Sequence, residues 1–248
     1  MKKNILLTGG SGNLGKKILL SNDGMIFLSP DRKELDICSP ASIKEYSKKN
    51  SFDTVIHCAA LARMSECEAS PAHAFKTNTV GTLNLVNSVK EIEQSSKKNI
   101  RFIYISTDGV YKCDEGNYSE SSATIPYNVY GWSKLGGETA VRTLKNYCVI
   151  RTRFYDPGNI PFTESAVDII TSSIEIEKLI QSIQFLAKDK FQGVINIGNE
   201  ESSEFIRYSA HKPEIRKCNK ADIVKNLNFE IATNASMDIS LMKKVIKS

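Results

Sequence analysis

The chain has 248 residues, of which 41% are hydrophobic and 25% are charged, with a formal net charge of +5. This length and composition predict one compact α/β domain, or one such domain with a small lobe. The basic residues are spread along the chain rather than gathered in one arm, so we expect no nucleic-acid partner. No apolar run reaches the roughly 18 residues of a membrane span, and the N-terminus lacks the apolar core of a signal peptide, so we expect a cytoplasmic protein.

Apolar runs rich in β-branched residues alternate with longer amphipathic stretches through the first 150 residues. This alternation is typical of βαβ units and a parallel sheet. The predicted strands are Asn4 to Thr8, Met25 to Ser29, Thr54 to Cys58, Arg101 to Ser106, Tyr147 to Arg151 and Gly193 to Ile197.

Three stretches between and after these strands carry apolar residues at helical spacing: Pro71 to Lys90, Tyr130 to Leu144 and Ile174 to Ala187. Phe154 to Ser173 has two prolines, a glycine and no sustained period, so it is predicted to be a surface loop. We therefore expect a dinucleotide-binding domain over residues 1–153. Residues 154–248 would return partly to the sheet, at 174–198, and partly form a small substrate lobe.

A glycine-rich turn, TGGSGNLG, follows the first predicted strand and places glycines at positions 9, 12 and 15. A tight turn from strand to helix exposes backbone N–H groups to a pyrophosphate, and glycine lets the backbone approach it closely. Because the turn follows an apolar strand and precedes a second one, we predict a dinucleotide cofactor.

The second strand is followed by Asp31, Arg32 and Lys33. An acidic residue here would bind the ribose 2′-hydroxyl of NAD, whereas an arginine would accommodate the 2′-phosphate of NADP. The cluster of basic residues, which Lys16 extends, favours NADP, while Asp31 leaves NAD open. Asp36 offers a carboxylate to the adenine amino group, or belongs to an ordinary helix start.

Tyr130 and Lys134 are four residues apart, so on a helix they lie on the same face. A phenol can donate a proton to a carbonyl oxygen that receives hydride, and a nearby cation is expected to lower its pKa. Thr107 follows an apolar strand, at the edge of the sheet where ligands bind in open α/β folds, and it could hydrogen-bond the same carbonyl.

The segments TGGSGNLG, HCAA, STDGVY, NVYGWSKLGGE and VINIGN, in this order, resemble the extended short-chain dehydrogenase/reductase superfamily. Within it, the run from Asp108 to Glu138 and the LDICSP segment are most similar to the dTDP-4-dehydrorhamnose reductase group. This resemblance implies a Rossmann-type fold and NADPH-dependent reduction of a nucleotide-activated 4-keto-6-deoxy sugar.

The resemblance also implies the site residues. Tyr130 would be the general acid, Lys134 would hold the nicotinamide ribose, and Thr107 would orient the sugar carbonyl. The implied cofactor contacts are Gly9, Ser11, Gly12, Asn13, Leu14, Arg32, Asp36, Ile37, Cys58, Ala59, Ala60, Ala62, Asn78, Tyr130 and Lys134. The implied substrate contacts are Asp108, Tyr111 and Arg153. Arg151 and Arg207 are further candidates for a diphosphate, since guanidinium matches phosphate.

Other activities stay open at this point. Related dehydratases carry Asp-Glu directly after the threonine, and here the pair is Asp108-Gly109, which disfavours dehydration. A 4-epimerase needs little beyond Thr, Tyr and Lys, and a non-catalytic regulatory subunit with the same fold is suggested by the short segment after Phe154. A homodimer is compatible with the resemblance. The six cysteines lack zinc-site spacing, so we expect free thiols and no metal.

Overall fold

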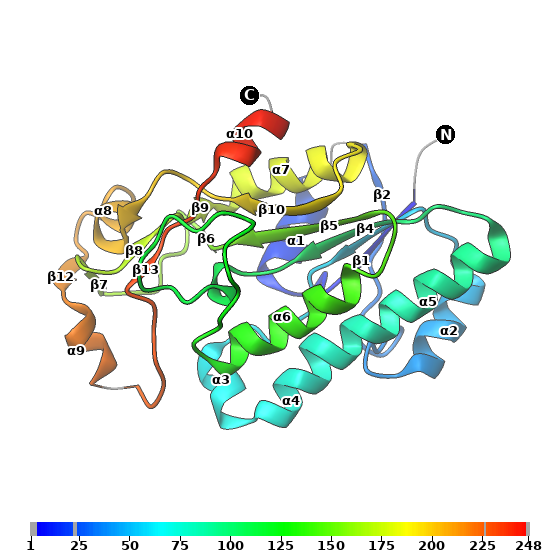
Figure 1. The fold of residues 1–248 in the computed structure, drawn as a ribbon, viewed down its shortest axis with the longest axis horizontal. Coiled ribbons are helices and arrows are strands. Elements are labelled where there is room, and N and C mark those ends of the chain that lie inside the picture. The colour runs from blue at the N-terminus through cyan, green and yellow to red at the C-terminus, as the bar shows by residue number, and fades with distance from the viewer. Residues whose placement is uncertain (1–3, 22–23, 226, 247–248) are drawn as a thin grey trace.

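The computed structural model describes residues 4–21, 24–225 and 227–246, and its centre is a parallel sheet in the order β10-β5-β4-β3-β1-β2 (Figure 1). Its strands are β1 (Asn4–Thr8), β2 (Ile26–Leu28), β3 (Thr54–His57), β4 (Arg101–Ile105), β5 (Tyr147–Thr152) and β10 (Gly193–Ile197). The chain places β2 on one side of β1 and β3 on the other, so the strand order reverses there. A crevice opens at such a point at the carboxyl ends of the strands. The predicted Rossmann-type sheet is confirmed.

Successive side chains of each strand point to opposite faces of the sheet and build two cores. Ile5 and Leu7 of β1 belong to one apolar cluster, and Leu6 between them belongs to the other. The strands are therefore buried on both faces, which explains why they appear in the sequence as continuous apolar runs.

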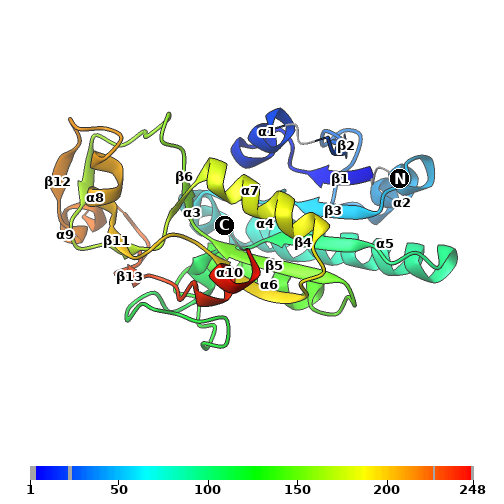
Figure 2. The same ribbon diagram turned by 90° about the horizontal axis from the view of Figure 1, so that it is seen from above.

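Helices cover both faces (Figures 1 and 2). On one face α1 (Asn13–Leu20) packs against α7 (Ile176–Lys188). On the other face α5 (Gly81–Ser96) packs between α2 (Pro40–Lys49) and α6 (Val129–Val141). The predicted helices at 130–144 and 174–187 are confirmed within a few residues. Helix α2 was not predicted, although Ser39 accepts a hydrogen bond from the Ser42 amide and Pro40 opens the helix, both common start signals.

The predicted helix at 71–90 is longer and less regular than expected. It consists of α4 (Pro71–Phe75), a π-helical turn (Lys76–Val80) and α5, and it follows the short helix α3 (Met64–Ala69). π-Helical turns within α-helices are often found at functional sites. Here the turn contains Asn78, whose side chain points into the protein interior.

A small lobe stands at the carboxyl ends of the strands, on the left of Figures 1 and 2. Its strands are β6 (Phe154–Tyr155), β7 (Glu164–Ala166), β8 (Ile170–Thr171), β9 (Ile174–Glu175), β11 (Ser202–Ser203), β12 (Arg216–Cys218) and β13 (Asn234–Ala235). Helices α8 (Glu204–Ser209) and α9 (Lys220–Val224) complete it, and α10 (Ser240–Val245) lies against β10. The expected division of the chain at residues 153 and 154 stays a prediction.

The surface loop predicted for Phe154 to Ser173 is partly wrong, because this stretch contains β6, β7 and β8. Each of these strands has only two or three residues, which is too short to produce a visible period. Their partners are distant in sequence: β7 pairs with β12, and β8 lies between β11 and β13.

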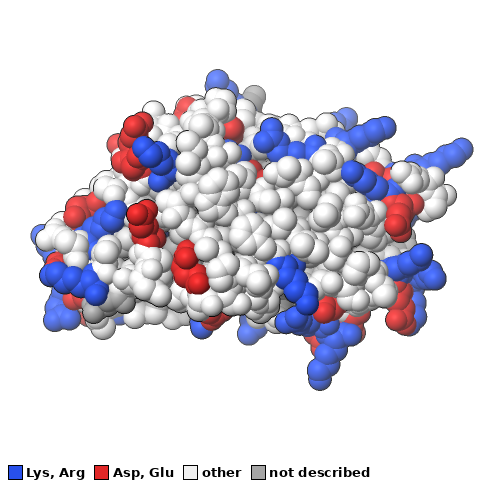
Figure 3. Space-filling view, turned by 60° about the horizontal axis from the view of Figure 1, so that its bottom comes forward, with Lys and Arg blue, Asp and Glu red and all other residues white. Residues whose placement is uncertain are grey.

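The helical face opposite α1 and α7 is largely uncharged across its middle (Figure 3). Exposed apolar side chains on its helices are Phe75, Val80, Leu83 and Trp132. Within the described ranges, no helix has both the length and the apolar character needed to cross a membrane.

Candidate active site

Three neighbouring pockets follow the carboxyl edge of the sheet. The glycine-turn pocket, about 270 Å³, lies between the ends of β1, β2 and β3. The central pocket, about 360 Å³, shares Gly12, Cys58 and Ala60 with it. The lobe pocket, about 830 Å³, shares Met64, Tyr127, Arg153 and Phe154 with the central pocket. Together they provide a continuous path from the glycine turn to the lobe.

The glycine turn brings the backbone of β1 against the end of β3. Gly9 has φ +75°, and a Cβ on it would lie 2.6 Å from the Ala59 nitrogen. The Gly12 amide donates to the Gly9 carbonyl over 3.0 Å, and α1 begins at the next residue. A Cβ on Gly12 would make one tight contact, 3.3 Å from the Gly9 carbonyl oxygen, so packing restricts this position far less than Gly9. The turn therefore leaves open backbone at a helix start, which fits a pyrophosphate.

The structure of the segment after β2 distinguishes Asp31 from Arg32, the two residues that sequence reasoning left as alternatives for binding the cofactor ribose. The Asp31 carboxylate accepts hydrogen bonds from the amides of Lys33 and Glu34, at 2.7 and 3.0 Å, so it is engaged in its own turn. The Arg32 side chain is 74% exposed at the rim of the glycine-turn pocket, with its Nε 3.9 Å from Asp36 Oδ1. A guanidinium is thus the freer of the two groups, and it suits a phosphate.

Tyr130, Lys134 and Thr107 all line the central pocket. Asn128 accepts a hydrogen bond from the Gly131 amide over 2.8 Å and so fixes the start of α6, the helix that carries Tyr130 and Lys134. Thr107 lies two residues after the end of β4, and its hydroxyl accepts from the Gly109 amide over 3.1 Å. A phenol, an ammonium group and a hydroxyl therefore face one cavity at the mouth of the cofactor crevice.

The expected lowering of the Tyr130 pKa is wrong for this structure. Burial of the phenol and the negative charge of Asp108 raise its pKa, and these effects exceed the opposing effects of Arg153 and Thr107. Lys134 is not among the groups that shift it. Tyr130 is therefore protonated at neutral pH, which is the form that a proton donor needs.

Lys134 is 2% exposed, and its ammonium lies 4.1 Å from the centre of the Tyr104 ring. Burial lowers the pKa of Lys134 to about 8, although Cys58 and Glu138 favour the charged form. The electrons of the Tyr104 ring attract the ammonium and so partly compensate for its burial. The group is thus charged at neutral pH but close to its titration range.

Asn78 joins the end of β3 to α6. Its Oδ1 accepts from the Leu61 amide over 2.8 Å, and its Nδ2 donates to the Leu61 carbonyl over 3.0 Å and to Ser133 Oγ over 2.8 Å. The loop that follows Cys58 is thus tied to the residue before Lys134. Asn78 lies beneath the crevice and lines none of the three pockets.

Arg153 stands between the central pocket and the lobe pocket. Its Nε donates to Asp108 Oδ2 over 2.6 Å, and its Nη1 lies 3.5 Å from Glu204 Oε1. Burial opposes the charge of this guanidinium, but Asp108, Tyr127 and Glu204 outweigh it and raise the pKa of Arg153. Two carboxylates thus engage the cation before any ligand reaches it.

The family model described as the RmlD substrate binding domain matches residues 1–164. The chain belongs to the RmlD substrate binding domain family. The predicted resemblance to the dTDP-4-dehydrorhamnose reductase group is confirmed.

Two relatives of this RmlD family chain are reductases by name. It is 27% identical over 183 residues to a dTDP-4-keto-6-deoxy-D-glucose reductase of Streptomyces niveus, covering 72% of this chain and 59% of that one. It is 29% identical over 162 residues to a dTDP-4-dehydrorhamnose reductase of Mycobacterium tuberculosis, covering 62% and 51%. The alignments thus span between one half and three fifths of these relatives.

Solved structures share the fold at low identity. A dTDP-4-dehydrorhamnose reductase of Bacillus anthracis, in complex with NADP, superposes with a TM-score of 0.85 at 21% identity, covering 98% of this chain and 92% of that one. RMD of Pseudomonas aeruginosa, complexed with NADPH, gives 0.77 at 19% identity, covering 98% and 92%. At this identity the likeness establishes the fold of the RmlD family chain.

Most of the predicted site residues line the path formed by the three pockets. The glycine-turn pocket contains Gly9, Ser11, Gly12, Arg32, Asp36, Ile37, Cys58, Ala59 and Ala60. The central pocket contains Leu14, Ala62, Thr107, Asp108, Tyr130, Lys134 and Arg153, and Asn13 lines the lobe pocket.

Besides Asn78, three further predicted contacts line none of the three pockets. Tyr111 is fully buried, accepts from Arg151 and donates to Asn196, so the structure argues against contact with substrate. Arg151 is paired with Glu138 in the interior, and Arg207 donates to the carbonyls of Thr171 and Glu200. Arg151 lies within β5 and Arg207 within α8, and the sequence gives no sign of their interior partners.

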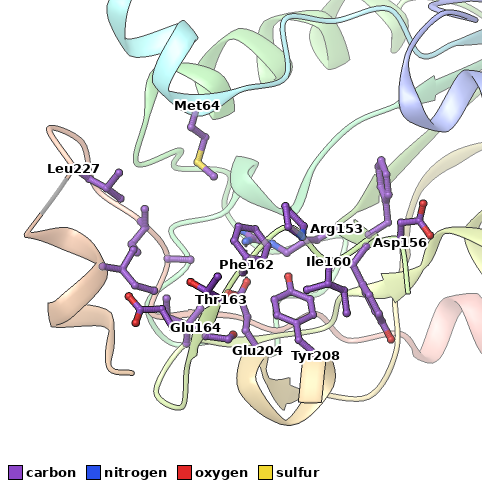
Figure 4. A pocket seen from close by; sticks show the side chains of 18 of the residues that line it. Met64, Arg153, Asp156, Ile160, Phe162, Thr163, Glu164, Glu204, Tyr208 and Leu227 are labelled. Atoms are coloured by element: carbon purple, nitrogen blue, oxygen red, sulfur yellow. Dashed lines mark ion pairs between the residues drawn. The ribbon is translucent and has the colours of Figure 1, made fainter. Parts of the chain in front are cut away.

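Apart from Asn13 and Arg153, sequence reasoning missed the lining of the lobe pocket. Figure 4 shows Phe162, Tyr208 and Glu204 grouped beside Arg153, with Met64 reaching in from α3. Phe162 is 50% exposed and stacks on Tyr208 at 5.7 Å between ring centres. Lys212 donates to the carbonyls of Ile160 and Phe162 and so braces this loop. Isolated aromatic residues in an irregular segment carry no sequence signal that would place them together.

Proposed function

We propose that this chain is an NADPH-dependent reductase of the keto group of a nucleotide-activated 4-keto-6-deoxy sugar. The observation that supports this most is the arrangement of Thr107, Tyr130 and Lys134 around one pocket that continues into the glycine-turn pocket. The names of the relatives from Streptomyces niveus and Mycobacterium tuberculosis agree with it.

The residues of the crevice fit a dinucleotide. The open face of Gly12, the helix start at Asn13 and the exposed guanidinium of Arg32 would hold the pyrophosphate and the 2′-phosphate. When bound, NADPH supplies the hydride. Arg32 favours NADPH over NADH because Asp31 is engaged with backbone amides. A structure with NADPH bound to an RmlD-like fold is consistent with this preference.

Three side chains would perform the proton chemistry. Tyr130 donates its phenolic proton to the substrate oxygen as that oxygen gains negative charge. The Thr107 hydroxyl hydrogen-bonds the same oxygen and orients the carbonyl. Lys134, which lines the same pocket, would hold the ribose of the nicotinamide nucleotide. Because its pKa is raised, Tyr130 keeps its proton until negative charge develops on the substrate oxygen.

The sugar would occupy the central pocket and the nucleotide would extend into the lobe pocket. That pocket is large enough for a nucleoside, since ligand pockets typically measure about 300 to 1,000 Å³. The exposed face of Phe162, supported by Tyr208, offers a flat apolar surface to a base. Arg153 lines both pockets and so lies at the junction between the sugar and the nucleotide.

The test is NADPH oxidation by the purified protein with a panel of dTDP- and GDP-4-keto-6-deoxy sugars. We expect oxidation that depends on one of these sugars, with one NADPH consumed for each sugar reduced, and slower oxidation of NADH. Sugar interconversion without net cofactor consumption would identify a 4-epimerase instead. Binding of NADPH without turnover of any sugar would overturn the reductase and favour a regulatory subunit.

The finer statements about partners and location are also proposals. We propose a homodimer, supported by the exposed apolar side chains on the helical face of Figure 3, and sedimentation of the purified protein tests it. A cytoplasmic location is supported by the cysteines, all of which are free.

A further inference from the structure

Glu138 and Arg151 form an ion pair in the protein interior, outside the three pockets. Arg151 Nη2 lies 2.8 Å from Glu138 Oε2, and its Nε donates to Oε1 over 3.1 Å. The side chains are 0% and 2% exposed. Ser106 donates from its hydroxyl to Glu138 Oε1 over 2.5 Å. The carboxylate thus receives hydrogen bonds from the residue that follows β4 and from a residue of β5.

This carboxylate connects the three elements that carry the site. Glu138 is one helical turn after Lys134 on α6, so both lie on the same side of that helix. Ser106 directly precedes Thr107 at the end of β4. Arg151 is in β5, two residues before Arg153. Glu138 is therefore one helical turn from a residue that faces the central pocket, and each of its two partners is one or two residues from another.

We propose that Glu138 is a positioning residue for the reaction: by binding Ser106 and Arg151 it sets α6 against the ends of β4 and β5. The proposal rests on the proposed reductase function for its kinetic part. Proton transfer and hydride transfer require groups placed within fractions of an ångström, and a misplacement of about 1 Å from a remote change can lower the rate by about 100-fold. A buried ion pair contributes little net stability, so its presence here suits a geometric role.

Glu138 also affects the charge of Lys134. The groups that face this ammonium are the Tyr104 ring below it, His57 and Cys58 at the end of β3, and Glu138 on its own helix. Burial lowers the pKa of Lys134, and Glu138 opposes that effect. Removal of the carboxylate therefore favours the neutral amine, so a loss of activity at alkaline pH begins at a lower pH.

The test variant is Glu138→Gln, which keeps the size and the hydrogen-bonding capacity of the side chain and removes its charge. Because this leaves Arg151 as an unpaired buried charge, the double variant Glu138→Gln with Arg151→Met is made beside it, in case the single variant does not fold. The matched control is Arg101→Met. Arg101 is also a buried arginine, 4% exposed, but it lies at the opposite end of β4 and donates to Asn146 and to the Leu186 carbonyl.

Amide hydrogen exchange of the protein without ligand tests the placement of α6 independently of any activity. We expect amides of residues 129–137 to exchange about tenfold faster in the Glu138 variants, with those of α5 unchanged. In Arg101→Met the α6 amides keep their protection. Equal protection of α6 in all variants, or equal loss in the control, would overturn the proposal.

Kinetics then test the consequence for the reaction. We expect kcat to fall at least about tenfold in the Glu138 variants, with KM for NADPH within about threefold, because the lost contacts act on the reacting geometry. The alkaline limb of the pH profile shifts to lower pH, which a purely structural defect would not cause. If the wild-type protein turns over no keto sugar, the proposed function fails, while the exchange experiment still decides the role of Glu138.

Discussion

Arg153 donates from Nε to the Asp108 carboxylate over 2.6 Å, and Arg153 lines both the central pocket and the lobe pocket. Asp108 Oδ1 also accepts from the Thr107 hydroxyl over 3.1 Å. The position of Thr107 therefore depends on a carboxylate that Arg153 holds in place.

Arg153→Met is expected to destabilise the protein by about 3 kcal/mol, because it leaves the buried Asp108 carboxylate without its cation. It also releases Thr107, so kcat falls together with the free energy of unfolding. Chemical denaturation and steady-state kinetics measure the two effects. Arg216→Met, which removes an exposed arginine paired with Glu164, serves as the control and should change neither. An unchanged stability of Arg153→Met would contradict the role of the pair.

Tyr130→Phe removes the proton donor and leaves the ring in place. We expect kcat to fall by about 100- to 10,000-fold, the range that a positioned acid contributes, with NADPH affinity almost unchanged. The melting temperature should stay the same, since the phenol faces a pocket. Binding of NADPH followed by fluorescence and sugar reduction followed by absorbance check the two parts. Full activity of this variant would exclude Tyr130 as the acid.

The titration of Lys134 predicts an alkaline limit to activity. Burial lowers the pKa of this group to about 8, so the ammonium is charged below that pH and becomes neutral as the pH rises through it. If the charged form is required, kcat/KM for NADPH is constant at neutral pH and decreases above about pH 8. A pH profile of the wild-type protein measures this. The limb should be absent from the residual activity of Lys134→Met, and a wild-type profile that is flat to pH 10 would contradict the prediction.

Two glycines of the turn are expected to respond differently to alanine. At Gly9 the backbone has φ +75° and a Cβ would meet the Ala59 nitrogen at 2.6 Å, so Gly9→Ala should lower the free energy of unfolding by about 2 kcal/mol or more. At Gly12 the nearest atom is 3.3 Å away, a tight contact that a shift of a few tenths of an ångström relieves, so Gly12→Ala should lose much less stability than Gly9→Ala. Its methyl group would stand where the pyrophosphate approaches, raising the Kd for NADPH about tenfold. Unfolding and NADPH titration distinguish the two, and normal NADPH binding by Gly12→Ala would place the cofactor elsewhere.

Phe162→Ala tests the lobe pocket as the nucleotide site. Loss of an aromatic stacking partner is worth about 0.5 to 1.5 kcal/mol, so KM for the sugar nucleotide should rise about two- to twelvefold, with kcat nearly unchanged. Ile206→Ala is the control, because Ile206 is 64% exposed and lines none of the three pockets. Equal KM values for the two variants would remove Phe162 from the binding site.

The sheet and the cofactor crevice could be predicted from the sequence because each depends on local patterns. Buried strands appear as apolar runs, and the glycine turn is contiguous in the chain. Tyr130 and Lys134 were found for the same reason, since four residues on a helix always share a side.

The rest depends on contacts between distant segments. Arg151 and Arg153 are two residues apart on one strand, yet the first pairs with Glu138 in the interior and the second with Asp108 at a pocket. No local pattern separates them. The lobe is built from strands of two or three residues whose partners lie 20 or more residues away, so neither its strands nor its pocket could be predicted.

The π-helical turn at Lys76–Val80 is the feature expected from an α-helix that accommodates one extra residue. Deletion of a single residue there would allow residues 71–96 to run as one regular α-helix. Because each residue advances an α-helix by about 100°, the deletion would also turn Asn78 away from Leu61. The deletion would make the helix more regular. It would also release the loop that contains Ala59, Ala60 and Ala62, which lines one side of the crevice.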